Sequence, residues 1–227
     1  MVDAKLSREA FLIGDEKVNS LKNKKVLICG TGGVGSFVAE ALARTGVGEL
    51  TLVDFDNIDI SNLNRQIMSN KNNIGKAKVE VLKKRLEIIS DVKVITEQVF
   101  VDENYQLKDK YDYIADCMDN LSAKFHINML GKKMGIKVIS SMGAARRISS
   151  NGIAYTTLDK TRNDPLARNF RLLCRKKGFD AHKVKVVYCD SVPLEQSNSD
   201  ALGSFIFPVG TIGLKIAEVI FLSLINE

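Results

Sequence analysis

The sequence is poor in the residues that build zinc sites and disulfide frameworks. Its four cysteines, in a chain of 227 residues, lie far apart and form no C-x-x-C pair. This spacing predicts neither a structural zinc ion nor a set of disulfide bonds. We therefore expect four reduced thiols, as is usual in a cytoplasmic protein.

Long apolar runs are also scarce. The first eight residues lack the apolar core of a signal peptide. The most apolar stretch, 205–225, is interrupted by Pro208, Lys215 and Glu218, which predicts a buried helix rather than a membrane span. We find no internal repeat and no low-complexity segment, and we expect no membrane partner.

The overall composition is that of an ordinary globular protein. Apolar residues make up 45% of the chain and charged residues 26%, and the length allows one sizeable core. The formal net charge of +6 favours an anionic partner only weakly, because many basic proteins bind no nucleic acid.

A glycine loop between two apolar segments is the most informative feature. Gly30, Gly32 and Gly35 have the G-x-G-x-x-G spacing, between a predicted strand at 26–29 and a helix that ends near Thr45. This spacing permits a tight turn, close approach of the backbone to phosphate, and an anion site at the helix N-terminus. The glycines of this loop are Gly30, Gly32, Gly33 and Gly35. The pattern predicts a nucleotide site of a kind that dinucleotide-dependent dehydrogenases also have.

The pattern of apolar residues predicts an α/β fold. After a helical lead-in at 5–23 that breaks at Gly14, strands and helices alternate up to residue 141. We predict a Rossmann-like, doubly wound, mostly parallel sheet with helices on both faces and a ligand crevice beyond the strand carboxyl ends. The predicted strands are 26–29, 49–53, 92–99, 111–116, 137–141, 153–158 and 183–188, and the later helices are 75–89, 122–134, 165–177 and 207–225. We expect one domain, with a nucleotide-binding core at about 1–145 and a smaller substrate-side extension at about 146–227.

Polar side chains follow several of these strands. Asp54 ends the second strand, where a carboxylate can accept a hydrogen bond from a ribose hydroxyl. Arg65 can bind phosphate in a bidentate way, and Lys78 supplies a second positive charge. Of Asp116 and Asp119, we expect one to cap the helix that begins near Asn120 and Asp119 to hold Mg²⁺ beside phosphates. The candidate ligands of the nucleotide, beyond the glycines, are Asp54, Asp56, Asn62, Asn64, Arg65, Gln66, Lys78, Asp119 and Asn120. This set suits a triphosphate that loses pyrophosphate better than it suits NAD.

Five motifs carry a resemblance to a known family. They are Gly30-Thr31-Gly32-Gly33-Val34-Gly35-Ser36, Val53-Asp54-Phe55-Asp56, Asn62-Leu63-Asn64-Arg65-Gln66, Gly75-Lys76-Ala77-Lys78 and Asp116-Cys117-Met118-Asp119-Asn120. Together they resemble the adenylation core shared by ubiquitin-activating enzymes and the bacterial ThiF/MoeB-type activators of sulfur-carrier proteins. The resemblance implies binding of ATP and Mg²⁺ and attack of a carboxylate on the α-phosphorus. It further implies that Asp54 binds the ribose and that Arg65 and Lys78 bind the phosphates. By the same resemblance Asp119 binds the metal, and Arg65, Lys78 and Asp119 are catalytic residues.

The resemblance also implies a subunit arrangement. In that family an arginine six residues before a glycine, near the N-terminus, reaches into the ATP site of the neighbouring subunit. Arg8 stands six residues before Gly14. The implication is a homodimer in which Arg8 acts as a catalytic residue in the partner's site.

Two further segments resemble one branch of this superfamily. Residues 39–46 and the run Asp159-Lys160-Thr161-x-x-Asp164-Pro165-Leu166-Ala167 are similar to tRNA threonylcarbamoyladenosine dehydratases. This resemblance implies adenylation of the threonylcarbamoyl carboxylate on the adenosine beside the anticodon, followed by ring closure with net loss of water. A tRNA substrate would dock across the basic clusters, and we expect contacts from Arg146 and Arg147 and from the helix at 165–177, which carries Arg168, Arg171, Arg175, Lys176 and Lys177.

Other functions stay open at this point. An activator of a small sulfur-carrier protein is the main alternative, although such activators usually have two C-x-x-C pairs that this chain lacks. A sulfur-transfer partner therefore finds no support in the sequence, and we expect Cys189 to be an inert buried thiol, as Cys29 and Cys117 also are. An NAD-dependent oxidoreductase and an ATP-binding scaffold are two further alternatives. The polar stretch at 196–203 is a candidate lid.

Overall fold

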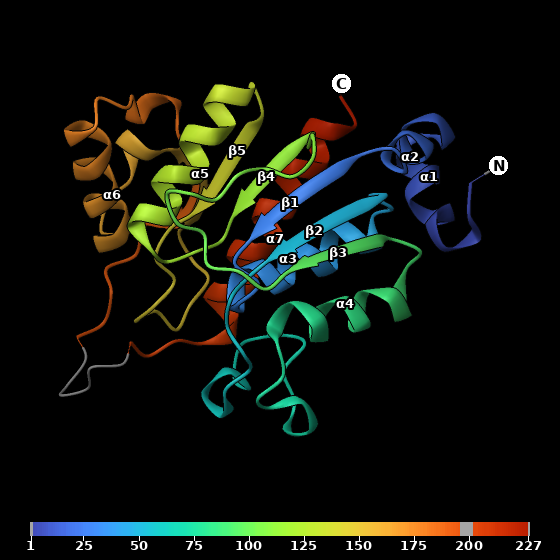
Figure 1. Ribbon diagram of the computed structural model, residues 1–227, viewed down its shortest axis with the longest axis horizontal. Coiled ribbons are helices and arrows are strands. Elements are labelled where there is room, and N and C mark those ends of the chain that lie inside the picture. Colours follow the sequence, from blue (N-terminus) through green and yellow to red (C-terminus); the bar gives the residue numbers. More distant parts are fainter. Residues whose placement is uncertain (1, 196–201, 227) are drawn as a thin grey trace.

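The computed structural model describes residues 2–195 and 202–226, and within them the strands form one seven-stranded sheet (Figure 1). The order across the sheet is β3-β2-β1-β4-β5-β7-β6, and β6 alone runs antiparallel to its neighbour. The strands are β1 (Lys25–Cys29), β2 (Glu49–Val53), β3 (Lys93–Glu97), β4 (Tyr113–Asp116), β5 (Lys137–Ser141), β6 (Ile153–Thr157) and β7 (Lys185–Cys189). The predicted doubly wound, mostly parallel α/β fold is confirmed.

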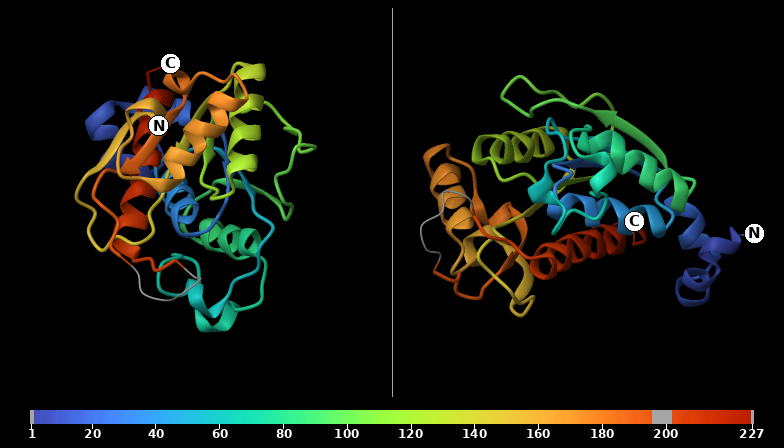
Figure 2. Two further views of the ribbon diagram at one scale, coloured as in Figure 1. Left: turned by 90° about the vertical axis from the view of Figure 1, so that its left-hand side faces the viewer. Right: turned by 90° about the horizontal axis from the view of Figure 1, so that it is seen from below.

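Helices cover both faces of this sheet (Figure 2). The α-helices are α1 (Ser7–Ile13), α2 (Asp15–Leu21), α3 (Gly33–Arg44), α4 (Lys78–Ile89), α5 (Leu121–Met134), α6 (Pro165–Lys176) and α7 (Ile206–Leu224). Short 3₁₀ turns lie at Ala4–Leu6, Ile60–Asn62, Lys71–Asn73, Leu158–Lys160 and Ala181–Lys183. Buried side chains of α3, α4 and α7 form one core against the sheet, whereas α5 and α6 pack on the opposite face. Because both faces are covered, β1 and β2 consist almost entirely of buried residues.

The strand order places a crevice at a definite point. The chain leaves β1 toward β2 on one side and later returns to β4 on the other side of β1. At such a reversal the loops after neighbouring strands diverge, which leaves a crevice beyond their carboxyl ends. The glycine loop follows β1 and therefore lies at this position.

Helix α7 packs along α3, as expected for a core helix. By length and composition it could cross a membrane, but Ile212, Ile216 and Ile220 are fully buried in the fold. The contact with α3 is close, because a Cβ atom at Gly213 would lie 2.6 Å from the Val34 carbonyl oxygen. This packing agrees with the prediction of a buried helix.

Several boundaries differ from those predicted. Helix α4 begins at Lys78 rather than near residue 75, because Gly75 has a φ of +83° and ends the preceding turn. Strand β3 ends at Glu97, two residues early. The predicted break at Gly14, where φ is +86°, is confirmed and separates α1 from α2. Most of the candidate lid, residues 196–201, lies outside the described residues.

Candidate nucleotide site

The glycine loop brings β1, α3 and the β4–α5 loop into close contact. Gly30 has a φ of +87°, and a Cβ atom there would lie 2.8 Å from the Cys117 carbonyl oxygen. A Cβ atom at Gly35 would overlap the Gly30 carbonyl oxygen. Only glycine fits at these two positions, and the result is a helix whose first amide groups face the crevice.

Asp54 is held by the glycine loop itself. Its Oδ2 atom accepts hydrogen bonds from the Thr31 backbone N–H at 2.7 Å and from the Thr31 hydroxyl at 3.1 Å. Its Oδ1 atom accepts one from the Asp56 backbone N–H at 2.9 Å. A carboxylate has about four acceptor positions, so Asp54 can still accept from a ribose hydroxyl. Sequence reasoning missed Thr31, which is fully buried and fixes the orientation of this carboxylate.

Lys78 and Asp56 form an ion pair beside the site. The Lys78 Nζ atom lies 2.6 Å from the Asp56 Oδ2 atom, and the backbone N–H of Lys78 donates to the Asp56 carbonyl oxygen at 3.0 Å. The Lys78 side chain is only 8% exposed, whereas that of Asp56 is 44% exposed. A cation in the first turn of a helix is unfavourable for the helix dipole. The ion pair with Asp56 offsets this cost.

Arg65 lies next to the glycine loop. A Cβ atom at Gly33 would lie 3.6 Å from the Arg65 Cγ atom. The Arg65 Nη1 atom donates to the Ser61 carbonyl oxygen at 2.8 Å and to the Asn64 Oδ1 atom at 2.9 Å. No described residue accepts from the other guanidinium donors. Protein oxygens thus hold the Nη1 atom in place, and the remaining N–H donors of the guanidinium are available to an anion.

Three predicted ligands also hold the local structure of their loops. The side chain of Asn62 is 8% exposed and forms a capping box with Asp59, while Gln66 is 5% exposed and accepts from the Ser69 hydroxyl at 3.4 Å. Asn120 caps α5 by accepting from the Ala123 N–H at 3.0 Å. Hydrogen bonds from Ser61, together with the weaker effect of Lys78, hold the pKa of Asp59 below its ordinary value.

Asp116 and Asp119 have different surroundings. Asp116 is fully buried, and both of its oxygens lie 3.1 Å from the Nζ atom of the equally buried Lys124. The prediction that one of the two aspartates caps α5 is wrong, because Asn120 is the cap. Asp119 is exposed and accepts no hydrogen bond from any described residue. Sequence reasoning also missed Lys124, whose place on the buried face of an apolar helix was the available signal.

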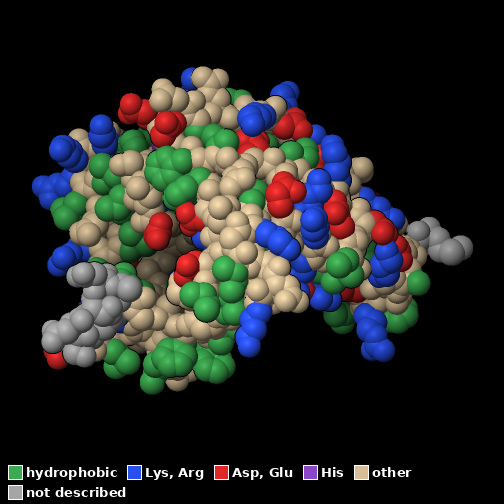
Figure 3. Space-filling view, turned by 60° about the horizontal axis from the view of Figure 1, so that its bottom comes forward, with side chains coloured by type: hydrophobic (Ala, Val, Ile, Leu, Met, Phe, Trp, Pro, Cys, Tyr) green, Lys and Arg blue, Asp and Glu red, His purple; other side chains and the backbone are tan. Residues whose placement is uncertain are grey.

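The residues around Asp119 fit a Mg²⁺ ion that would be coordinated mainly by phosphate oxygens of a bound nucleotide, with Asp119 as a protein ligand. Within the described residues no three His, Cys, Asp or Glu side chains converge on one point. Mg²⁺ commonly binds one or two carboxylates together with substrate phosphates rather than a full protein cage. Asp119 matches that pattern, because it is an exposed carboxylate one residue after Met118, whose backbone lies against Gly30 of the glycine loop. Figure 3 shows a hollow in the surface on this side of the molecule, with acidic side chains at its rim.

Arg8 lies far from the glycine loop of its own chain. It is exposed on α1, which packs near the amino ends of β1 and β2, while the glycine loop follows the carboxyl end of β1 (Figure 1). The side chains of Phe11 and Leu12 on the same helix are 85% and 87% exposed.

Two arginines expected to contact tRNA have structural roles. Arg147 is 4% exposed, and its guanidinium donates to four carbonyl oxygens at 3.0–3.2 Å. The Arg171 Nη1 atom donates to the carbonyl oxygens of Leu158 and Thr161, at 3.1 Å each. Arg147 is therefore too deeply buried for the predicted tRNA contact, whereas Arg171 is only partly buried and its contact with tRNA stays a prediction. Arg168, Arg175 and Lys176 are exposed.

All four thiols are free, as predicted. Burial raises the pKa of Cys29 and of Cys117, which lie at the carboxyl ends of β1 and β4, and it raises the pKa of Cys174 to about 11. Cys189 is fully buried, with its Sγ atom 3.0 Å from the Ser191 hydroxyl. The expectation of an inert, packed Cys189 agrees with this burial.

A comparison with protein-family models decides the family. The model of the ThiF family matches residues 6–180. The chain belongs to the ThiF family. Among relatives with assigned names, it is 39% identical over 192 residues to the tRNA threonylcarbamoyladenosine dehydratase of Bacillus subtilis, which covers 83% of this chain and 75% of that protein. It is 36% identical to the dehydratase of Escherichia coli, over 71% of this chain and 62% of that protein.

Solved structures extend this ThiF-family likeness to nearly the whole chain. The E. coli tRNA N6-threonylcarbamoyladenosine dehydratase in complex with ATP superposes with a TM-score of 0.91 at 28% identity. The superposition covers 98% of this chain and 94% of the other. The resemblance to the dehydratase branch of the family, noted from the sequence, is therefore confirmed.

Proposed function

We propose that this protein is an ATP-dependent tRNA threonylcarbamoyladenosine dehydratase. The observation that carries the proposal is the position of Arg65 and Lys78 around a glycine loop at the carboxyl end of the sheet. Arg65 beside the start of α3 and Lys78 at the start of α4 supply two cations, which suit a polyphosphate under attack better than a dinucleotide. The similarity to named dehydratases supports the choice of substrate.

The residues of this chain act first on ATP. The amides at the start of α3 and the guanidinium of Arg65 bind phosphate oxygens, and Lys78 shares its charge between Asp56 and the phosphates. Asp54 accepts from the ribose. Asp119 and the phosphates would hold Mg²⁺, which would withdraw negative charge from the phosphoryl oxygens.

Two bond-forming steps follow on this scaffold. A carboxylate oxygen of the threonylcarbamoyl group attacks the α-phosphorus, and pyrophosphate leaves. A nitrogen or oxygen of the same modification then attacks the activated carbonyl, and AMP leaves with that carboxylate oxygen while the nucleophile's proton passes to solvent. Because both reactants belong to one bound nucleotide, ring closure needs no enzyme nucleophile.

The assembly proposed here is a homodimer. Arg8 is too far from its own glycine loop to serve it, so it would complete the site of a partner subunit. The exposed Phe11 and Leu12 on the same helix are suited to pack against that partner. The region up to about residue 145 binds the nucleotide, the remainder faces the tRNA, and a tRNA substrate implies a cytoplasmic enzyme.

The decisive experiment weighs the nucleoside product. Purified protein is incubated with ATP, Mg²⁺ and tRNA that carries threonylcarbamoyladenosine, and the tRNA is then digested under mild conditions. We expect a loss of one water from the nucleoside, dependent on ATP and abolished in Arg65→Ala but not in Lys84→Ala, a matched control on the exposed side of α4. An unchanged nucleoside would contradict the proposed substrate. If pyrophosphate exchange into ATP then occurred with another acceptor, an activator of a carrier protein would be favoured.

A further inference from the structure

The ion pair of Asp116 and Lys124 joins the two ends of the loop that carries Asp119. Asp116 is the last residue of β4, and Lys124 lies in the first turn of α5. Neither side chain is exposed, and both Asp116 oxygens lie 3.1 Å from the Lys124 Nζ atom. From inside the fold, the pair therefore spans the loop 117–120 between strand and helix.

Stability alone gives little reason for this pair. Taking two charges out of water costs free energy that their attraction only partly returns, and apolar side chains of similar volume are often as stable or more so. The neighbouring residues Ile114, Ala115 and Ile127 are apolar and fully buried, so an apolar pair would suit these surroundings. The contacts that Asp116 makes with the loop give a second reason for the pair.

Asp116 holds the backbone of the loop. Its Oδ1 atom accepts a hydrogen bond from the Met118 N–H at 3.2 Å. The Met118 nitrogen also lies close to the glycine loop, because a Cβ atom at Gly30 would lie 3.0 Å from it. Asp119 follows directly, and its side chain accepts no hydrogen bond from any described residue. The backbone that Asp116 holds therefore directs the Asp119 carboxylate.

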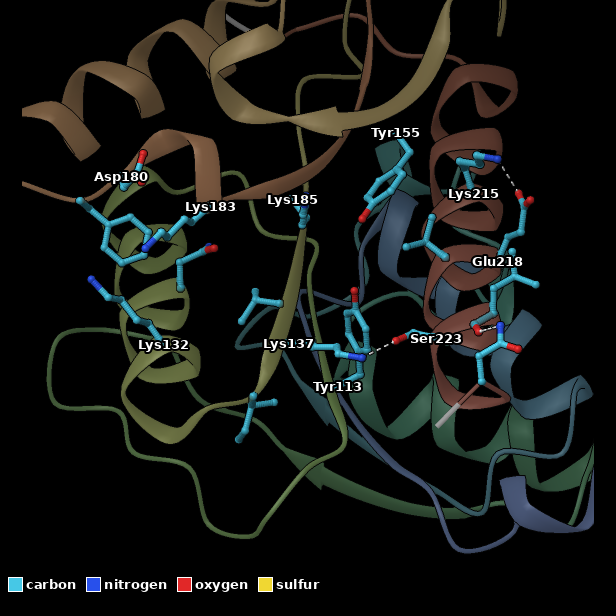
Figure 4. Close-up of a pocket in the computed structure, with 17 residues that line it drawn as sticks. Tyr113, Lys132, Lys137, Tyr155, Asp180, Lys183, Lys185, Lys215, Glu218 and Ser223 are labelled. Atoms are coloured by element: carbon cyan, nitrogen blue, oxygen red, sulfur yellow. Dashed lines mark hydrogen bonds and ion pairs between the residues drawn. The ribbon is translucent and has the colours of Figure 1, made fainter. Parts of the chain in front are cut away.

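Lys124 reaches Asp116 from a helix that is bonded to the sheet. Asn128, one turn later in α5, donates to the Lys124 carbonyl oxygen at 2.9 Å and to the Ser140 hydroxyl of β5 at 3.0 Å. Asn128 also lines a cavity of about 840 Å³ between α5 and α7 (Figure 4). Because α5 borders a cavity there, the hydrogen bond to β5 helps to fix the position of Lys124.

We propose that the ion pair of Asp116 and Lys124 positions Asp119 as a ligand of Mg²⁺ and so sets the affinity of the site for the Mg²⁺ complex of ATP. This inference rests on the proposed function, in which Asp119 is a metal ligand. Both members of the pair are buried and act through the loop, so they are positioning residues. Removing a group that orients a metal ligand commonly lowers metal affinity by about 10- to 100-fold.

The test compares two ways of removing the charges. In Asp116→Leu/Lys124→Met, apolar side chains of similar shape leave no acceptor for the Met118 N–H. In Asp116→Asn/Lys124→Gln, the two amides can hydrogen-bond to each other, and an amide oxygen can still accept from Met118. The matched control is Glu49→Met/Lys93→Met, which removes an ion pair of 2.8 Å at the amino ends of β2 and β3.

The measurement is the affinity for a non-hydrolysable ATP analogue, by calorimetry, in EDTA and in saturating Mg²⁺. We expect the apolar variant to bind the metal-free analogue as wild type does and its Mg²⁺ complex about 10- to 100-fold more weakly. The amide variant and the control should bind both forms normally. Urea unfolding establishes that each variant is folded. If the apolar variant does not fold, Asp116→Ala/Lys124→Met, which adds no volume, takes its place with the same expectations.

Several outcomes would overturn the proposal. Equal losses for both forms of the analogue would show that the pair only supports the glycine loop, and no loss would show that it has no role toward the metal. The same loss in the amide variant or in the control would also contradict it. If Asp119→Ala binds the Mg²⁺ complex normally, or if wild type binds no analogue, the proposed function fails at its metal ligand or at ATP. Both results differ from normal binding by the apolar variant alone.

Discussion

Lys78 opens helix α4 with its ammonium group 2.6 Å from the carboxylate of Asp56. The pair lies just after β2, next to the loop in which Thr31 holds Asp54. A buried cation at a helix N-terminus works against the helix dipole, and Asp56 offsets that cost. We propose that Lys78 also binds the phosphates of ATP.

Replacing Lys78 tests this interpretation. We expect Lys78→Gln to weaken ATP binding by about 10- to 150-fold, because a hydrogen bond to a charged group is worth about 1.5–3 kcal/mol. Calorimetric titration with a non-hydrolysable ATP analogue measures the effect. Lys76→Gln, two residues earlier and exposed, is the control and should bind normally. If wild type, Lys78→Gln and Lys76→Gln bound the analogue with equal affinity, Lys78 would have no role in ATP binding.

Asp119 is expected to set the Mg²⁺ requirement. In Asp119→Ala, pyrophosphate exchange should need at least about tenfold more Mg²⁺ for half-maximal rate, because a ligand to the ion is lost. The exposed carboxylate of Glu103 offers a matched control in Glu103→Ala. An unchanged Mg²⁺ dependence would show that another group holds the metal.

The buried pair of Lys124 and Asp116 should be costly to break. Lys124→Met leaves a fully buried carboxylate unpaired, and we expect a loss of about 3–5 kcal/mol in the free energy of unfolding. Thermal and urea unfolding measure it, with the exposed Lys133→Met on the same helix as control. The double variant Asp116→Asn/Lys124→Met should recover part of the loss. If Lys124→Met unfolded with the same free energy as wild type, the predicted cost of the unpaired carboxylate would be wrong.

Thiol reactivity should be low in the native protein. With its pKa raised to about 11, about one Cys174 side chain in a thousand is ionised at pH 8, and the thiolate is the reactive form. We expect an aromatic disulfide reagent to react slowly at pH 8 and faster as the pH approaches 11. In guanidinium chloride all four thiols should react at once. Rapid reaction of native Cys174 at pH 8 would show that it is not buried.

Much of the nucleotide site follows from local sequence. The glycine spacing at 30, 32 and 35 permits one kind of strand–loop–helix turn, because side chains at Gly30 and Gly35 would meet backbone atoms. Buried parallel strands are continuous apolar runs, so their ends, and the polar residues that follow them, are readable from the chain. Asp54, Arg65 and Lys78 were predicted from these positions.

Contacts between distant segments had to come from the tertiary structure. From the sequence alone, Lys124, Arg147 and Arg171 would be expected on the surface, as most basic residues are. In the structure each of these side chains donates hydrogen bonds to oxygen atoms of other segments. The sheet order that puts antiparallel β6 at the edge is equally non-local. Local backbone geometry depends on neighbouring residues, whereas pairing and charge clustering depend on which elements pack together, and only the folded chain decides that.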